Sequence, residues 1–196
     1  MASHRVLVAD PISEHGVTLL NDHSDITADF IPDLGSQPDK LLEIIGDYDA
    51  LIVRSQTKPN AEVIARASRL RAIGRAGVGV DNIDREAASA HGVIVMNTPT
   101  GNTVSTAEHA FALMLATARN IAPAHAGVLA GDFKNSRKAF SGIEMNGKRL
   151  AVIGMGRIGS EFVKRAQGFN MKVVAFDPFL TQARADELKI ELADSP

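Results

Sequence analysis

The sequence contains no cysteine and no tryptophan, and it has a single tyrosine. Without cysteine the chain can form neither a disulfide nor a thiolate metal site, which fits a reducing compartment. We therefore expect a cytoplasmic protein. No metal-binding residues are nominated. No stretch approaches the roughly 18 consecutive apolar residues of a membrane span, and the N-terminus has no signal-peptide pattern. These absences predict no membrane partner.

An excess of charge of either sign is also missing. The net charge is −2 over 196 residues, of which 22% are charged and 45% hydrophobic. A nucleic-acid partner requires a concentrated basic face, so we expect none. The basic clusters are interpreted by default as solvated surface. They comprise Lys134, Arg137, Lys138, Lys148 and Arg149. The composition is that of a globular protein with one large or two small domains.

The first half of the chain alternates short apolar runs with helical patterns. Strands are predicted over 5–9, 26–30, 50–53, 70–73 and 93–96, and helices over 13–22, 39–45, 60–68 and 83–90, with Asn60 as an N-cap. This alternation predicts right-handed crossovers and a parallel sheet covered on both faces. We interpret residues 1–98 as a flavodoxin-like, doubly wound α/β domain that binds the substrate.

A turn-rich segment over 97–101 predicts a boundary, so a second domain is expected over 99–196. A helix over 103–119 is apolar around much of its circumference and is expected to be deeply buried or at an interface. A second helix is predicted over 123–130, where Gly131 ends it.

The most specific motif lies late in the chain. A predicted strand over 150–153 leads into Gly154, Gly156 and Gly159, a helical pattern follows, and a second strand ends at Asp177. Strand, glycine turn, helix, strand and acid are the parts of a dinucleotide-binding unit. The alternative is a glycine-rich turn in an unrelated α/β domain.

Each residue of this motif has a physical role. Gly154 permits the tight turn, Gly156 lets the backbone approach a pyrophosphate, and Gly159 lets the helix pack against the strand. The helix that opens near Arg157 directs free amides at the pyrophosphate. Asp177 can bind both ribose hydroxyls but would repel a 2′-phosphate, so NAD is favoured over NADP.

The dinucleotide-binding domain is predicted to be incomplete. A full Rossmann domain uses about six strands, whereas after residue 149 only two strands and a helix over 182–188 are found. The strand over 150–153 would then present an unpaired apolar edge. We expect the chain to be the N-terminal part of a longer protein, with a partner chain that supplies the rest as the alternative.

Two loops follow strands of the first domain, where open α/β sheets bind ligands. Arg54 and Ser55 could clamp a carboxylate or a phosphate, and the glycine-rich segment 74–82 exposes consecutive amides that suit an anion. The alternatives are a surface salt bridge for Arg54 and a tight packed turn for the segment.

Four stretches together resemble the D-2-hydroxyacid dehydrogenases, and within them the D-3-phosphoglycerate dehydrogenases: residues 54–55, 74–82, 97–109 and 154–159. The resemblance implies NAD-dependent oxidation of 3-phosphoglycerate to 3-phosphohydroxypyruvate in serine biosynthesis. It also implies a homodimer or homotetramer formed through the cofactor domain, with a phosphorylated 2-hydroxy acid as the substrate.

The resemblance also implies residue roles. Arg54, Ser55 and Asn102 contact the substrate anion, and the amides of Val78 and Gly79 hold its carboxylate, with Val78 also beside the nicotinamide. The cofactor contacts comprise Arg157, Ile158 and Asp177, and Lys134, Arg137 and Lys138 reach the phosphate bound by a neighbouring subunit.

No catalytic residue is nominated. The resemblance places the catalytic histidine, glutamate and arginine beyond residue 196, and none of the six histidines adjoins a candidate substrate loop. His109 is expected to be packed within the long helix. Two alternatives stay open: a dehydrogenase for glycerate, hydroxypyruvate or lactate, and a non-catalytic NAD-binding module like the corepressors that share this scaffold.

Overall fold

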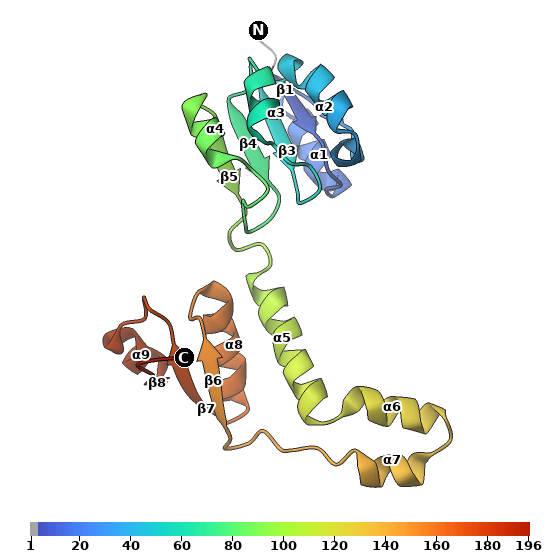
Figure 1. The fold of residues 1–196 in the computed structure, drawn as a ribbon, viewed down its shortest axis with the longest axis vertical. Coiled ribbons are helices and arrows are strands. Elements are labelled where there is room, and N and C mark those ends of the chain that lie inside the picture. Colours follow the sequence, from blue (N-terminus) through green and yellow to red (C-terminus); the bar gives the residue numbers. More distant parts are fainter. Residues whose placement is uncertain (1–3) are drawn as a thin grey trace. The chain divides into compact units, whose positions relative to one another are not determined.

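The computed structural model describes residues 4–196. The chain forms two compact units, Met1–Gly101 and Asn102–Pro196, called unit 1 and unit 2 below. In Figure 1, unit 1 runs from blue to green and unit 2 from yellow-green to red. Each unit has a hydrophobic core of its own, so each is described separately.

Unit 1 contains one parallel sheet of five strands. The strands are β1 (His4–Val8), β2 (Ile26–Phe30), β3 (Ala50–Val53), β4 (Ala72–Arg75) and β5 (Ile94–Asn97), in the order β2-β1-β3-β4-β5. This is the flavodoxin-like doubly wound order, so the expected fold class is confirmed. The register pairs Val53 with Arg75 and Arg75 with Asn97, so β3, β4 and β5 end at the same edge of the sheet.

Helices connect these strands and enclose a core between themselves and the sheet. They are α1 (Glu14–Asn21), α2 (Pro38–Ile44), α3 (Ala61–Arg66) and α4 (Arg85–Ala90), with the 3₁₀ turns η1 (Leu34–Ser36) and η2 (Ile45–Asp47). The predicted cap of α3 is confirmed, because the Asn60 side chain accepts a hydrogen bond from the Val63 N–H at 3.0 Å. Leu7, Leu51 and Ile73 of the central strands are fully buried.

Strand β4 begins two residues later than the sequence pattern predicts. The Leu70 N–H donates to the Ala67 carbonyl at 3.0 Å and so closes the turn after α3. Leu70 is thus apolar because it is buried in this turn, and the strand itself covers Ala72–Arg75.

Unit 2 begins with three helices and continues with a parallel sheet. The elements are α5 (Thr103–Ala118), α6 (Ile121–Leu129), α7 (Phe133–Ala139), β6 (Arg149–Ile153), α8 (Arg157–Gly168), β7 (Lys172–Phe176), α9 (Gln182–Leu188) and β8 (Glu191–Leu192). The sheet order is β6-β7-β8. Phe111 of α5 packs edge-to-face on Phe162 and Phe169, which fixes α5 against α8.

Two expectations for unit 2 can be compared with its burial. Of the two alternatives for the long helix, deep burial does not hold within this unit, because only Ala107 and Phe111 of α5 are buried and Leu113 is 55% exposed. A position at an interface stays a prediction. The exposed edge is found: within residues 4–196, β6 pairs with β7 alone, and Ile153 is 72% exposed. Across the same residues, no helix is long and apolar enough to cross a membrane.

Candidate functional site

The carboxyl edge of the unit 1 sheet carries the first group of candidate residues. Arg54 and Ser55 directly follow β3, and both are exposed. The Arg54 guanidinium makes one weak contact, to the Pro11 carbonyl at 3.3 Å, so it forms no ion pair within the described residues. A cation that is free at the end of a central strand can bind an anion with full charge assistance.

The segment 76–82 lies beside Arg54 at the same edge. Asn97 at the end of β5 donates to the Val78 carbonyl at 2.5 Å, and the Thr98 N–H donates to the Gly77 carbonyl at 3.0 Å. These two bonds fix the carbonyls of the turn. Among the hydrogen bonds of residues 4–196, none uses the N–H of Val78 or Gly79. Both amides therefore remain available to an anion.

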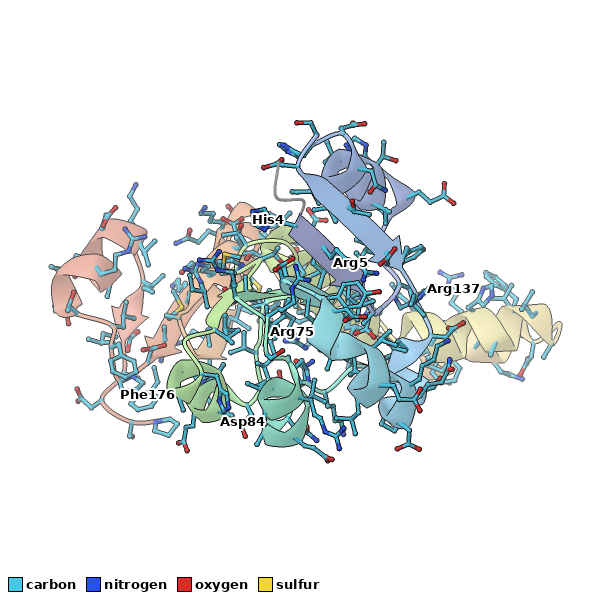
Figure 2. The ribbon with its side chains drawn as sticks, turned by 90° about the horizontal axis from the view of Figure 1, so that it is seen from above. His4, Arg5, Arg75, Asp84, Arg137 and Phe176 are labelled. Carbon is cyan, nitrogen blue, oxygen red and sulfur yellow. The ribbon has the colours of Figure 1, made fainter. Side chains whose placement is uncertain are left out.

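Arg75 is a residue of this edge to which the sequence analysis gave no role. Its side chain is 12% exposed and forms an ion pair with Asp81 at 3.3 Å. A Cβ at Gly79 would lie 2.9 Å from Nη1 of Arg75, so the glycine leaves room for the guanidinium. Figure 2 labels Arg75. Its position in the segment 74–82 was visible in the sequence, but its partner was not.

Asn102 is not grouped with these residues. It is the first residue of unit 2 and the N-cap of α5, and its side chain makes no capping hydrogen bond. Its carbonyl accepts from the Ser105 hydroxyl at 3.2 Å. Arg54, Ser55, Val78 and Gly79 thus share one edge of unit 1, whereas Asn102 belongs to the other unit.

The glycine turn of unit 2 connects β6 to α8. Gly154 has a φ of +98°, a conformation that side chains rarely adopt. A Cβ at Gly159 would overlap the Gly154 carbonyl oxygen, whereas a Cβ at Gly156 would meet nothing within 4 Å. The turn is therefore closed on its inner side at Gly159 and open at Gly156, where a ligand can approach the backbone.

Helix α8 starts directly after Gly156. The first amides of a helix have no partner within it, and no side chain caps this N-terminus. Arg157 is exposed and Ile158 is half-buried. Within residues 4–196 the Arg157 side chain forms no hydrogen bond or ion pair, so it is free to contact a phosphate.

Asp177 lies directly beside this turn. One of its carboxylate oxygens accepts from the Met155 N–H at 2.7 Å and the other from the Phe179 N–H at 2.8 Å. These backbone bonds, the one from Met155 first, hold the pKa of Asp177 below its ordinary value of 3.8. The carboxylate is therefore ionised at neutral pH, and each oxygen keeps a lone pair for a ribose hydroxyl.

The remaining candidates lie on unit 2 helices. His109 is exposed on α5, so the expectation that it is packed within the helix is wrong. Lys134, Arg137 and Lys138 are exposed on α7, a helix that the sequence analysis did not predict. Within residues 4–196 no group of three histidine or acidic side chains could hold a metal ion.

Known proteins resemble this chain in sequence and in fold. The family model of the D-isomer specific 2-hydroxyacid dehydrogenase catalytic domain matches residues 6–194. The chain belongs to this family. A D-3-phosphoglycerate dehydrogenase of Archaeoglobus fulgidus is 47% identical over 190 residues, which is 97% of this chain and 35% of that protein.

Solved structures agree with this assignment. The TT0316 protein of Thermus thermophilus has a TM-score of 0.85 at 30% identity, over 96% of this chain and 59% of that one. The apo form of D-mandelate dehydrogenase of Rhodotorula graminis has a TM-score of 0.84 at 25% identity, over 98% and 61%. The chain thus spans about a third of the length of this curated relative and about three fifths of each of the two solved chains.

Proposed function

We propose that this chain provides the substrate- and cofactor-binding residues of an NAD-dependent D-3-phosphoglycerate dehydrogenase. In the reaction, the C2 carbon of 3-phosphoglycerate loses a hydride and its hydroxyl loses a proton, which gives the ketone 3-phosphohydroxypyruvate. NAD supplies the hydride acceptor when it is bound. Unit 1 is proposed to hold the substrate, and unit 2 to hold the cofactor in a Rossmann-type arrangement.

The observation that carries this proposal is the pairing of the glycine turn with Asp177. The turn is open at Gly156, the amides of Arg157 and Ile158 open helix α8, and the ionised carboxylate touches the turn through the Met155 N–H. Diphosphate oxygens suit the amides, and ribose hydroxyls suit the carboxylate. Pro178 and Phe179 come directly after Asp177, so no arginine stands next to it to accept a 2′-phosphate, and NAD is proposed over NADP.

The substrate class rests on the free groups of unit 1. The Arg54 guanidinium with the Ser55 hydroxyl, and the amides of Val78 and Gly79, offer two anion sites at one sheet edge. A phosphorylated 2-hydroxy acid has two anionic groups, so it suits this edge better than D-glycerate does. Asn102 is proposed as an additional substrate contact.

Replacing Arg54 by alanine tests the substrate class. We expect the protein to bind 3-phosphoglycerate at least about tenfold more tightly than D-glycerate, and Arg54→Ala to lose about tenfold or more in affinity for the phosphorylated acid. Isothermal titration calorimetry with both acids measures this. The control is Arg69→Ala, because Arg69 pairs with Asp49 before β3, at the other end of the strand. Equal affinities for both acids would contradict the proposal.

The chain by itself is proposed to be unable to transfer hydride. None of its residues is assigned as the general base, so we expect no NADH formation above background with 3-phosphoglycerate and NAD. Absorbance at the NADH band, with a complete dehydrogenase of the same family as positive control, gives the result. Turnover at the rate of the positive control would show that the chain contains its own acid/base group.

Association through unit 2 is proposed from its exposed apolar helices. Side chains on α6 and α7 are unusually open for apolar residues, with Leu129 at 75% and Phe133 at 62% exposure. We expect a homodimer or homotetramer of a cytoplasmic enzyme, in which Lys134, Arg137 and Lys138 approach the phosphate bound by the neighbouring copy.

The variant Leu129→Asp tests this association. It should lower the mass measured by light scattering towards that of a monomer, because a charge cannot be buried unpaired in an apolar interface. Leu19→Asp is the matched control, since Leu19 is 52% exposed on α1 of unit 1. A wild-type protein that stays monomeric at all concentrations would refute the proposed interface.

A further inference from the structure

The loop that carries Arg54 and Ser55 is held by its main chain. Residues 54–57 connect β3 to the segment before α3, and Arg54, Ser55 and Gln56 are exposed while Thr57 is 1% exposed. Loops at strand ends are usually the mobile parts of a fold. Here the N–H groups of Arg54 and Thr57 donate to the Asp10 side chain, and their carbonyls accept from the Asn82 side chain. The Arg54 carbonyl also accepts from Nε of Arg75 at 3.3 Å.

Asp10 binds the donor groups of this loop. It follows β1, and it is fully buried. Its carboxylate accepts from the Arg54 N–H at 2.5 Å, from the Thr57 N–H at 3.1 Å and from the Thr57 hydroxyl at 2.6 Å. Three donors from both ends of a four-residue loop thus converge on one carboxylate, which draws the two ends together.

Asn82 binds the acceptor groups of the same residues. Its Nδ2 donates to the Arg54 carbonyl and to the Thr57 carbonyl, both at 2.7 Å. Two carbonyl acceptors require the amide nitrogen at this position, which settles the orientation of the side chain. Its Oδ1 is buried without a hydrogen-bond partner among the described residues, so the donor side of the amide alone holds it in place.

The inner side of the loop packs against the 3₁₀ turn η1. A Cβ at Gly35, in η1, would lie 2.8 Å from the Thr57 nitrogen and 2.9 Å from the Gln56 carbonyl carbon. The backbone of η1 therefore packs directly on the peptide that joins Gln56 to Thr57. The loop is fixed at both ends and along its inner side, and only its three outer side chains are free.

We propose that Asp10 and Asn82 are positioning residues for the substrate. They fix the backbone of Arg54 and Thr57 before any ligand arrives, so the Arg54 guanidinium and the Ser55 hydroxyl are presented in one arrangement to an anionic group. The inference deepens the proposed function and rests on it, because it assigns the ties to the loop that is proposed to bind the substrate. A preorganised loop loses less entropy on binding, so its ties contribute directly to substrate affinity.

Two substitutions test the role of the ties. In Asp10→Asn, one carboxylate oxygen becomes an NH₂ group that faces the N–H and O–H donors of the loop. In Asn82→Asp, a carboxylate oxygen faces two carbonyl oxygens. In both, we expect hydrogen exchange of the Arg54 and Thr57 amides to speed up at least about tenfold and the affinity for 3-phosphoglycerate to fall about tenfold, with NAD affinity unchanged.

A matched control and a milder variant complete the experiment. Asp84 also accepts a backbone N–H in unit 1, from Ala87 at 2.9 Å, and Figure 2 labels it. Asp84→Ala should destabilise unit 1 without changing exchange at residues 54 and 57 or the binding of 3-phosphoglycerate. Thr57→Val removes only the hydroxyl donor and keeps the shape of the side chain, so it serves if Asp10→Asn does not fold.

The possible outcomes separate this inference from the proposed function. Faster exchange together with weaker 3-phosphoglycerate binding supports it, whereas faster exchange with unchanged binding, or unchanged exchange, overturns it. If wild type and Arg54→Ala bind 3-phosphoglycerate equally, the substrate proposal fails instead. The exchange data then still show whether Asp10 and Asn82 hold the loop.

Discussion

Replacing Asp177 by asparagine will weaken NAD binding by about tenfold or more. The carboxylate offers two acceptor oxygens that are already oriented by the Met155 and Phe179 N–H groups, and an amide would put a donor on one of them. Hydrogen bonds to a charged acceptor are roughly twice as strong as those between neutral groups, so loss of the charge should be measurable as weaker NAD binding. Titration of the purified protein with NAD and with NADP measures both affinities.

The control and the pH dependence sharpen this test. Asp186→Asn changes another carboxylate of unit 2, one that accepts from Gln182 on the surface of α9, and should leave NAD binding unaffected. Because the folded-state pKa of Asp177 is lowered, its carboxylate remains charged, and its contribution is lost only as the pH falls through that lowered value. NAD affinity should therefore stay level between about pH 5 and pH 8, as far as Asp177 determines it. Equal binding of NAD and NADP by the wild type would contradict the assignment.

Replacing Gly159 of helix α8 by alanine should lower both the stability of unit 2 and its affinity for NAD. Gly159→Ala places a methyl group onto the Gly154 carbonyl oxygen, a backbone atom that cannot move without opening the turn. We expect a loss of about 1–3 kcal/mol in the free energy of unfolding of unit 2 and a parallel loss of NAD affinity. Urea unfolding followed by circular dichroism measures the first quantity, and titration the second.

Gly168→Ala is the matched control within the same helix. A Cβ at Gly168 would meet nothing within 4 Å, and its backbone has no positive φ. Alanine there should be neutral or should stabilise the helix by about 0.4–1 kcal/mol. If both alanine variants behaved alike, the close approach of Gly159 to Gly154 would not be a constraint on the fold.

The sequence was sufficient for the features that depend on local periodicity. Apolar strands that alternate with helices predicted the parallel sheet of unit 1, and Asn60 predicted the start of α3, because a side-chain cap acts within three residues. Helix α7 was missed because the stretch Phe133–Ala139 has little apolar periodicity, and its main packing partner is α6. Strand β8 has two residues and exists through its pairing with β7.

In the site too, residues marked by a local pattern could be predicted, whereas contacts between residues far apart in the sequence could not. The positions of Arg54 and of Gly154 were visible because strand ends and glycine spacing can be identified locally. Asp10 could have been noticed as a lone acid directly after a buried strand, but its partners Arg54 and Thr57 lie 44 and 47 residues away. His109 was misassigned because the apolar character of its helix does not reveal which side faces α8.

The open side of strand β6 has a practical consequence. Along residues 149–153, the N–H and C=O groups that do not face β7 have no strand to bond with in the described part of the chain, and Ile153 at the end of this strand is 72% exposed. Such a row is a template for strand addition, either by a correct partner segment or by another copy of itself. Concentrated samples should therefore be monitored for aggregation, and a charged substitution at Ile153 is the simplest way to suppress it.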